Sequence, residues 1–125
     1  MKIYGIVMAG AAGLFGLFHL LVIAGVIPST VVWGGRITDR RKLIVMESIS
    51  FIVLIGMGAL GYARGFALSR GEAAAFLGIA MWVLAALFTF NTVGNLFAKT
   101  RFERYAFTPV TMILAYLSVR LALGR

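Results

Sequence analysis

Cysteine is absent from this chain of 125 residues, which excludes disulfides, thiol catalysis and any metal or haem site that needs a cysteine ligand. Charged residues are scarce as well, at 13% of the chain against about a quarter in soluble domains. Histidine occurs once and proline twice. Because a lone histidine cannot hold a metal without help from several carboxylates, we expect no metal and no cofactor.

Hydrophobic residues make up 62% of the chain and occur in long blocks rather than in amphipathic stripes. A soluble domain of this size leaves much of its surface exposed and could not hide so much apolar area. There are four such blocks, with approximate ranges 3–27, 43–63, 73–98 and 105–123. Each block has about the twenty residues that are needed to cross a bilayer. Short connections favour antiparallel neighbours, so the sequence predicts an all-α, up-down bundle of four transmembrane helices in one domain, residues 1–125. No polar cleavage region follows the first block, which is therefore expected to be a retained span.

The basic residues lie mostly between the blocks, where they suit lipid headgroups better than nucleic acid. Twelve Lys and Arg against four acids give a net charge of +8. The first and third connections carry seven bases and the opposite side carries five. The positive-inside rule then predicts a multi-pass protein of the cell inner (plasma) membrane with both termini outside. The small difference also leaves open insertion in both directions, as in dual-topology dimers.

Two sequences match the Ser/Thr-x-x-Glu capping box that begins many helices, Ser69 to Glu72 and Thr100 to Glu103. We therefore expect a structural role, as helix caps, for both glutamates before any chemical role. Pro109 lies near the start of the fourth block, and we expect it to kink that helix rather than to begin it, because a later start leaves too short a span.

Small residues concentrate in the half of the bilayer next to the termini, where they predict close helix packing. They are Gly5, Ala9, Gly13, Gly56, Gly58, Gly61, Ala74 and Gly78.

Polar residues of all four blocks fall in the other half of the bilayer, next to the first and third connections. They are His19, Glu47, Ser50, Asn91, Asn95, Thr108 and Thr111. In the second, third and fourth blocks the two polar residues are three or four positions apart and so share a helix face. The sequence therefore predicts a bundle that is closed near the termini and opens into a polar pocket on the base-rich side.

Glu47 is the strongest candidate for a functional residue, because carboxylates inside membrane spans usually face a cavity or a partner. Its structural alternative is a shallow ion pair with an arginine of the first connection. His19 is a candidate proton acceptor, ligand-binding group or partner of Glu47, and equally a residue that joins two helices. Asn91 and Asn95, with Thr108 and Thr111, are candidate ligand contacts, although interhelical amide hydrogen bonds are the commoner role. Arg36 or Arg101 is expected to attract negative charge at the mouth of the pocket.

The stretches Trp33-Gly34-Gly35-Arg36 and Asn91-Thr92-Val93-Gly94-Asn95, followed by Glu103 and Thr108-Pro109, resemble small four-span bacterial integral membrane proteins that have no assigned function. The resemblance covers most of the chain and implies the same architecture, but it implies no activity.

Three functional hypotheses fit these observations. The first is a non-enzymatic membrane protein that binds or transports a small ligand, which is an anion, a protonatable solute or a lipid headgroup. The second is a membrane-embedded acid-base enzyme that acts on a lipid through Glu47 and His19, which requires the two side chains to be within about 3 Å of each other or of one substrate atom. The third is a structural subunit or assembly factor of a larger membrane complex. Besides the lipid bilayer, the expected partner is a second copy of the chain, as a homodimer, or that larger complex.

Overall fold

The computed structural model describes all 125 residues and contains four long helices and no strand. The helices are α1 (Lys2–Ile23), α2 (Arg40–Ser69), α3 (Ala75–Leu96) and α4 (Thr108–Leu123), and a π-helical segment, η3 (Glu103–Phe107), leads directly into α4. Two short 3₁₀ turns, η1 (Ser29–Val31) and η2 (Trp33–Gly35), lie in the connection between α1 and α2. All four helical segments are long and apolar enough to cross a membrane, which confirms the predicted all-α, multi-pass architecture.

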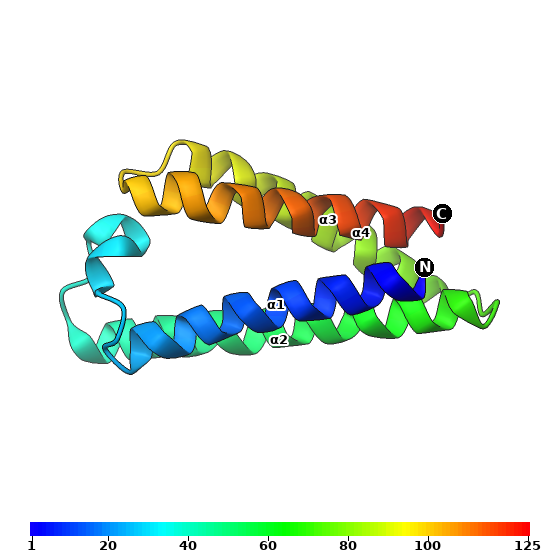
Figure 1. Ribbon diagram of the computed structural model, residues 1–125, viewed down its shortest axis with the longest axis horizontal. Helices are drawn as coiled ribbons and strands as arrows, with labels where there is room; N and C mark the ends of the chain where they lie inside the picture. Colours follow the sequence, from blue (N-terminus) through cyan, green and yellow to red (C-terminus); the bar gives the residue numbers. More distant parts are fainter.

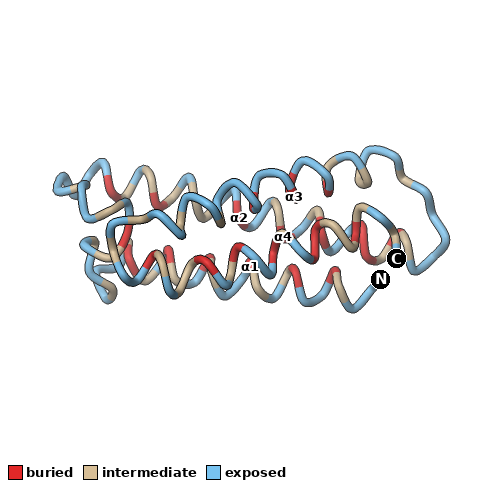
Figure 2. The backbone as a smooth tube through the Cα atoms, turned by 90° about the horizontal axis from the view of Figure 1, so that it is seen from above, coloured by how far each residue is buried: buried red, intermediate tan, exposed pale blue.

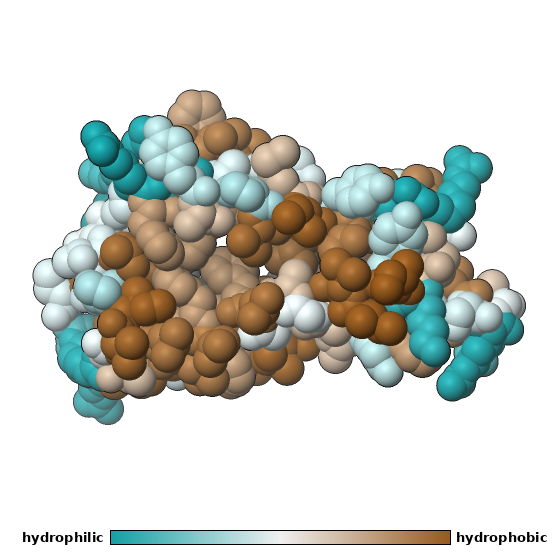
Figure 3. Space-filling model, in the orientation of Figure 1, coloured by the Kyte–Doolittle hydropathy of each residue, from teal (hydrophilic) through white to brown (hydrophobic).

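The helices form two antiparallel pairs, α1 with α2 and α3 with α4 (Figure 1). Both chain termini lie at one end of the molecule, here called the termini end. The pairs diverge toward the other end, the loop end, where η1 and η2 lie between them (Figure 1). Hydrophilic residues gather at both ends and a hydrophobic band lies between them (Figure 3), as expected for a bundle that spans a bilayer.

The second helix is longer than the sequence predicts, with 30 residues from Arg40 to Ser69. At 1.5 Å per residue it is about 45 Å long, more than the hydrocarbon thickness of a bilayer. Ser69 is therefore the last residue of α2 rather than a cap, and its hydroxyl donates to the carbonyl of Phe66. The predicted capping box at Ser69 to Glu72 is wrong, because α3 begins only at Ala75.

The first helix ends earlier than predicted, at Ile23 instead of Ile27. The Arg40 guanidinium donates to the Ile23 carbonyl at 2.5 Å and so satisfies one of the free carbonyls at this helix end. The first residue of α2 thus caps the C-terminal end of α1, and the connection between the two helices begins there.

Glycines bring α1 and α2 into backbone contact near the termini end. A Cβ on Gly65 would lie 2.9 Å from the Gly5 Cα, and a Cβ on Gly58 would lie 2.8 Å from the Ala12 Cβ. The predicted close packing at Gly5, Gly58 and Gly61 is present. For Gly13 and Gly56 the expectation is wrong, since a Cβ at either position would meet nothing within 4 Å.

Arg64 ties the two helix pairs together at the same end. Its Nε donates to the carbonyl of Leu121 in the last turn of α4, at 3.0 Å, and Nη1 donates to the carbonyl of Ala74 before α3, at 3.3 Å. The guanidinium packs on Gly78, where a Cβ would lie 3.3 Å from Nη2. The sequence suggested a connection residue here, but the side chain is buried and joins three helices.

A core of large apolar side chains fills the bundle from the glycine and Arg64 contacts at the termini end to the centre of the molecule. Its members come from α1, α3 and α4: Met8, Met81, Leu84, Phe88, Leu114, Leu117 and Leu121. Buried positions along all four helices face the interior (Figure 2). The termini half of the bundle is therefore closed by side-chain packing and by backbone contact.

The fourth span begins before Pro109, with helical residues from Arg101 onward. The segment from Glu103 to Phe107 is π-helical, and Pro109 follows in the first turn of α4. Proline cannot donate to the carbonyl four residues earlier, and a π-helical turn is one way to accommodate that missing bond. Pro109 therefore modifies the helix without starting it.

Gly65→Ala is expected to destabilise the protein by about 1–3 kcal/mol, because overpacking here moves backbone rather than a flexible side chain. The matched control is Gly10→Ala, where a Cβ meets nothing within 4 Å. Thermal unfolding in detergent, followed by circular dichroism, measures the difference. Equal melting temperatures for the two variants would contradict the close approach of α1 and α2.

Arg64→Ala is expected to lower the free energy of unfolding by about 2 kcal/mol, since it removes charge-assisted hydrogen bonds to the carbonyls of Leu121 and Ala74. Arg70→Ala is the control, because Arg70 is exposed just beyond α2. The same unfolding experiment applies. If Arg64→Ala has the same melting temperature as the wild type, the arginine does not hold the helix pairs together.

Candidate functional site

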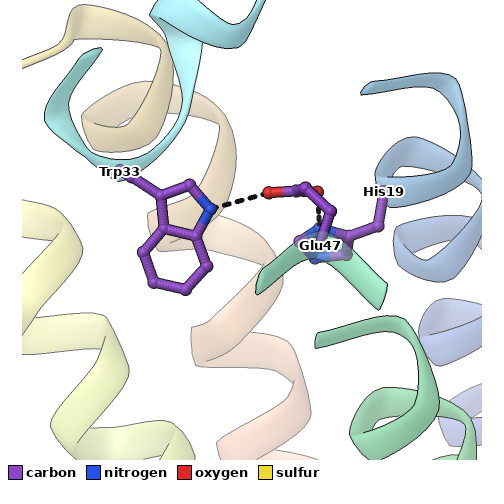
Figure 4. A network of polar contacts seen from close by, with 3 residues as sticks. All are labelled: His19, Trp33 and Glu47. Atoms are coloured by element: carbon purple, nitrogen blue, oxygen red, sulfur yellow. Dashed lines mark hydrogen bonds and ion pairs between the residues drawn. The ribbon is translucent and has the colours of Figure 1, made fainter. Parts of the chain in front are cut away.

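Glu47 lies in α2 toward the loop end and is completely buried. Its Oε2 lies 2.5 Å from Nδ1 of His19 on α1, and its Oε1 accepts a 2.7 Å hydrogen bond from the indole Nε1 of Trp33 in η2 (Figure 4). His19 and Glu47 are the only basic and acidic side chains of the chain whose nitrogen and oxygen atoms lie within 4.0 Å of each other. One carboxylate therefore connects the first helix, the second helix and the loop between them.

The loop reaches Glu47 through an unusual backbone. Trp33, Gly34 and Gly35 have φ angles of 53°, 64° and 71°, all in the left-handed region. Glycine adopts this region freely, whereas a tryptophan pays about 1–2 kcal/mol for it. Such an outlier persists only where surrounding contacts hold it, and here the Trp33 indole is held by Glu47.

A second buried carboxylate, Glu103, holds the same loop from the other helix pair. Its Oε1 accepts a hydrogen bond from the backbone N–H of Gly34 at 3.1 Å, and its Oε2 lies 2.7 Å from the Thr100 hydroxyl oxygen. The Thr100 hydroxyl also accepts from the backbone N–H of Glu103, at 3.1 Å. The predicted capping box is thus half formed, because the carboxylate turns to the loop instead of to the Thr100 backbone.

A cavity of about 380 Å³ lies between the two helix pairs below this loop. It is lined by sixteen residues of all four helical segments and η2: Phe15, His19, Trp33, Ser50, Val53, Leu54, Met57, Leu87, Phe88, Phe90, Asn91, Gly94, Asn95, Glu103, Phe107 and Thr111. Val53 of α2 and Phe90 of α3 line the cavity and are also exposed on the outer surface, Phe90 by 79%. The cavity therefore opens between α2 and α3 and extends from the loop end toward the closed core.

Four of the seven predicted site residues line this cavity, namely His19, Asn91, Asn95 and Thr111. Glu47 does not; it lies behind His19 and Trp33 and positions both. Arg36 is exposed and does not line it.

Thr108, the remaining predicted residue, is also outside the lining. It is buried, and its hydroxyl has no hydrogen-bond partner in the structure. The stretch before it is π-helical, so the regular spacing that suggested a shared face with Thr111 does not place both side chains in the cavity.

The polar side chains of the cavity wall are only partly hydrogen-bonded within the chain. Thr92 and Thr111 have their hydroxyl oxygens 2.9 Å apart across α3 and α4, and the Asn95 amide nitrogen lies 3.5 Å from the Thr111 oxygen. Asn91 is exposed and makes no side-chain hydrogen bond, although it lies within the apolar α3 span. An amide at such a position needs water or a ligand.

Sequence reasoning missed Glu103 and Trp33 as parts of the cavity wall. Glu103 had an adequate structural explanation as a cap, and Trp33 suited the aromatic belt of a membrane interface. The available signal was the Gly34-Gly35 pair, because two consecutive glycines after a tryptophan favour a tight turn that folds back on the protein.

The arrangement is suited to holding a proton and a polar solute rather than a metal. No three histidine or acidic side chains converge anywhere in the chain. His19 has one ring nitrogen on a carboxylate, and its other ring nitrogen makes no hydrogen bond within the chain. A carboxylate that orients an imidazole in this way prepares the free nitrogen for proton transfer or for a ligand.

Comparison of the chain with protein-family models, with curated protein sequences and with solved structures found no match.

Glu47→Leu is expected to release the Trp33 loop, because the indole N–H and the histidine both lose their acceptor. Trp33 and Trp82 are the two tryptophans, so the variant is made on a Trp82→Phe background. Acrylamide should then quench the emission of Trp33 more strongly than in the background protein. Glu72→Leu, in the connection at the termini end, is the control, and equal quenching in the two variants would show that Glu47 does not hold the loop.

Proposed function

We propose that the protein binds a small polar solute in the cavity between the helix pairs and moves it across the membrane with the His19–Glu47 pair as a proton-holding group. The observation that carries this proposal is the cavity itself, which brings His19, Asn91, Asn95 and Glu103 together in one half of a bilayer span. Polar groups at this depth are costly, and they are kept mainly where they line a pathway or bind a ligand.

The shape of the bundle supports access from one side. The cavity lies in the loop-end half and opens between α2 and α3, and the packed core with Arg64 closes the termini half. A protein that transports must also open the other half, and a single bundle of four helices has little room for that change. We therefore include a homodimer in the proposal, with the base-rich loop end on the cytoplasmic side of the inner membrane.

Native mass spectrometry of the gently purified protein tests the binding part of this proposal. The wild type should retain a small-molecule adduct that Asn91→Leu loses, because the substitution replaces an unpaired amide of the cavity wall by a side chain that lipid tolerates. Thr89→Leu is the matched control, since Thr89 lies on α3 but does not line this cavity and instead lines a separate hollow with Trp82 and Val93. The same spectra report the oligomeric state.

If the wild type carries only bulk lipid, or if Asn91→Leu keeps the adduct, the solute-binding proposal fails. Constant co-purification of a second protein would then favour a structural subunit.

One observation also favours a second candidate function, an acid-base enzyme that acts on a lipid. The 2.5 Å separation of His19 and Glu47 meets the distance that such chemistry requires. In this case the adducts of wild type and of His19→Gln should differ, with the unreacted substrate retained by the variant and the product by the wild type. Identical adduct masses and fragmentation in the two proteins would exclude it.

A further inference from the structure

The wall of the cavity lacks positive charge although the chain is strongly basic. None of the twelve Lys and Arg side chains lines it. At the loop end, Arg40 donates to the Ile23 carbonyl and Arg104 donates to the Ala98 carbonyl, while Arg36 is exposed. His19, the one basic side chain of the wall, is already bonded to the Glu47 carboxylate, which leaves Glu103 as the carboxylate of the wall without a basic partner.

Glu103 is a buried carboxylate without a cation. Its side chain belongs to a residue that is 8% exposed, and no Lys, Arg or His nitrogen lies within 4 Å of its oxygens. It accepts hydrogen bonds from Gly34 N–H and from Thr100, and each carboxylate oxygen retains a further lone pair. An unpaired buried charge is unfavourable, and a positive ligand in the adjoining cavity compensates it.

The remaining wall suits the same kind of ligand. Aromatic rings line the cavity from four elements, namely Phe15, Trp33, Phe88, Phe90 and Phe107. Aromatic faces attract cations, especially where water is excluded, and they also pack on apolar groups. The Asn91 and Asn95 side chains add carbonyl oxygens that can accept from an N–H. A volume of about 380 Å³ admits a molecule the size of a small aromatic amine.

Building on the proposed function, we infer that the solute is an organic cation, a protonated amine or a quaternary ammonium with an apolar body, whose charge is balanced by Glu103. Of the ligand classes that the sequence leaves open, an anion is disfavoured because it would meet the Glu103 carboxylate and no Lys or Arg, and the only histidine of the wall is already bonded to Glu47. The ammonium can belong to a free solute or to the headgroup of a lipid that enters between α2 and α3.

Benzyltrimethylammonium is a suitable probe, because its charge does not change with pH and it is small enough for the cavity. Its binding is measured in phosphatidylglycerol nanodiscs from the fluorescence of Trp33, which lines the cavity, on the Trp82→Phe background. We expect saturable binding that benzenesulfonate does not compete for. Glu103→Gln should weaken it by about tenfold or more, while Glu72→Gln, whose site lies at the opposite end of the bundle, should leave it unchanged.

Asn95→Asp provides a second variant that does not depend on the folding of Glu103→Gln. It adds a carboxylate to the same wall with almost no change in volume, and a cation should bind several times more tightly. Repeating the titration in phosphatidylethanolamine nanodiscs identifies the source of the natural cation. Weaker probe binding there indicates that a lipid ammonium occupies the cavity, whereas equal binding indicates a free solute.

Absence of saturable binding to the wild type, equal affinity for Glu103→Gln, or weaker binding to Asn95→Asp would each overturn the cation inference. These results leave the proposed function standing if native mass spectrometry still shows an adduct that Asn91→Leu loses. Without such an adduct, both proposals fail together.

Discussion

A carboxylate buried inside an apolar span has to be satisfied by the protein, and the structure around Glu47 follows from that constraint. Leaving such a group without partners costs several kcal/mol, and water is not available at this depth. The two donors come from different segments, the His19 imidazole of α1 and the Trp33 indole of the following loop. Glu47 therefore fixes both the pairing of α1 with α2 and the position of the loop over the open end of the bundle.

The two ends of the molecule are held by different kinds of contact, and the cavity is a consequence of that difference. At the termini end, glycines let α1 and α2 touch, and Arg64 connects α2 to the carbonyls of Leu121 and Ala74. At the loop end, the helix pairs diverge (Figure 1), and they are bridged by contacts from α1 and from the loop. The Gly34 N–H donates to Glu103, and the rings of Phe15 and Phe18 pack on Phe107. Space remains between α2 and α3 because none of these bridging contacts comes from either of those helices.

The depth of the polar residues could be predicted from sequence, but their direction around each helix could not. Distance from a span end gives the depth of His19, Asn91 and Asn95, and all three line the cavity at the loop end. Rotation is harder, because a helix that is apolar on all sides has no distinct face. This explains why the sequence predicts a helix contact for Gly13 and Gly56, which face open space, and does not single out Gly65, which packs against the backbone of Gly5.

The errors at the ends of α2 have a similar physical origin. A charged residue normally marks the end of a span, so Arg64 was assigned to a connection and Ser69 to a capping box. The helix continues because the guanidinium finds carbonyl acceptors at the ends of two neighbouring helices. Those acceptors come from residues far along the chain, and sequence proximity gives no sign of them. The same is true of Glu103, whose partner Gly34 lies 69 positions away.

The loop and the cavity wall form one unit, and the backbone of Trp33 shows why. Its left-handed conformation costs about 1–2 kcal/mol, which is similar to the contribution of one hydrogen bond to a charged group. The two bonds that offset this cost end on Glu47 and on Glu103. Each carboxylate thus has a part in closing the loop, Glu103 from the cavity wall and Glu47 from behind it. The same two side chains therefore position the loop and the polar wall below it.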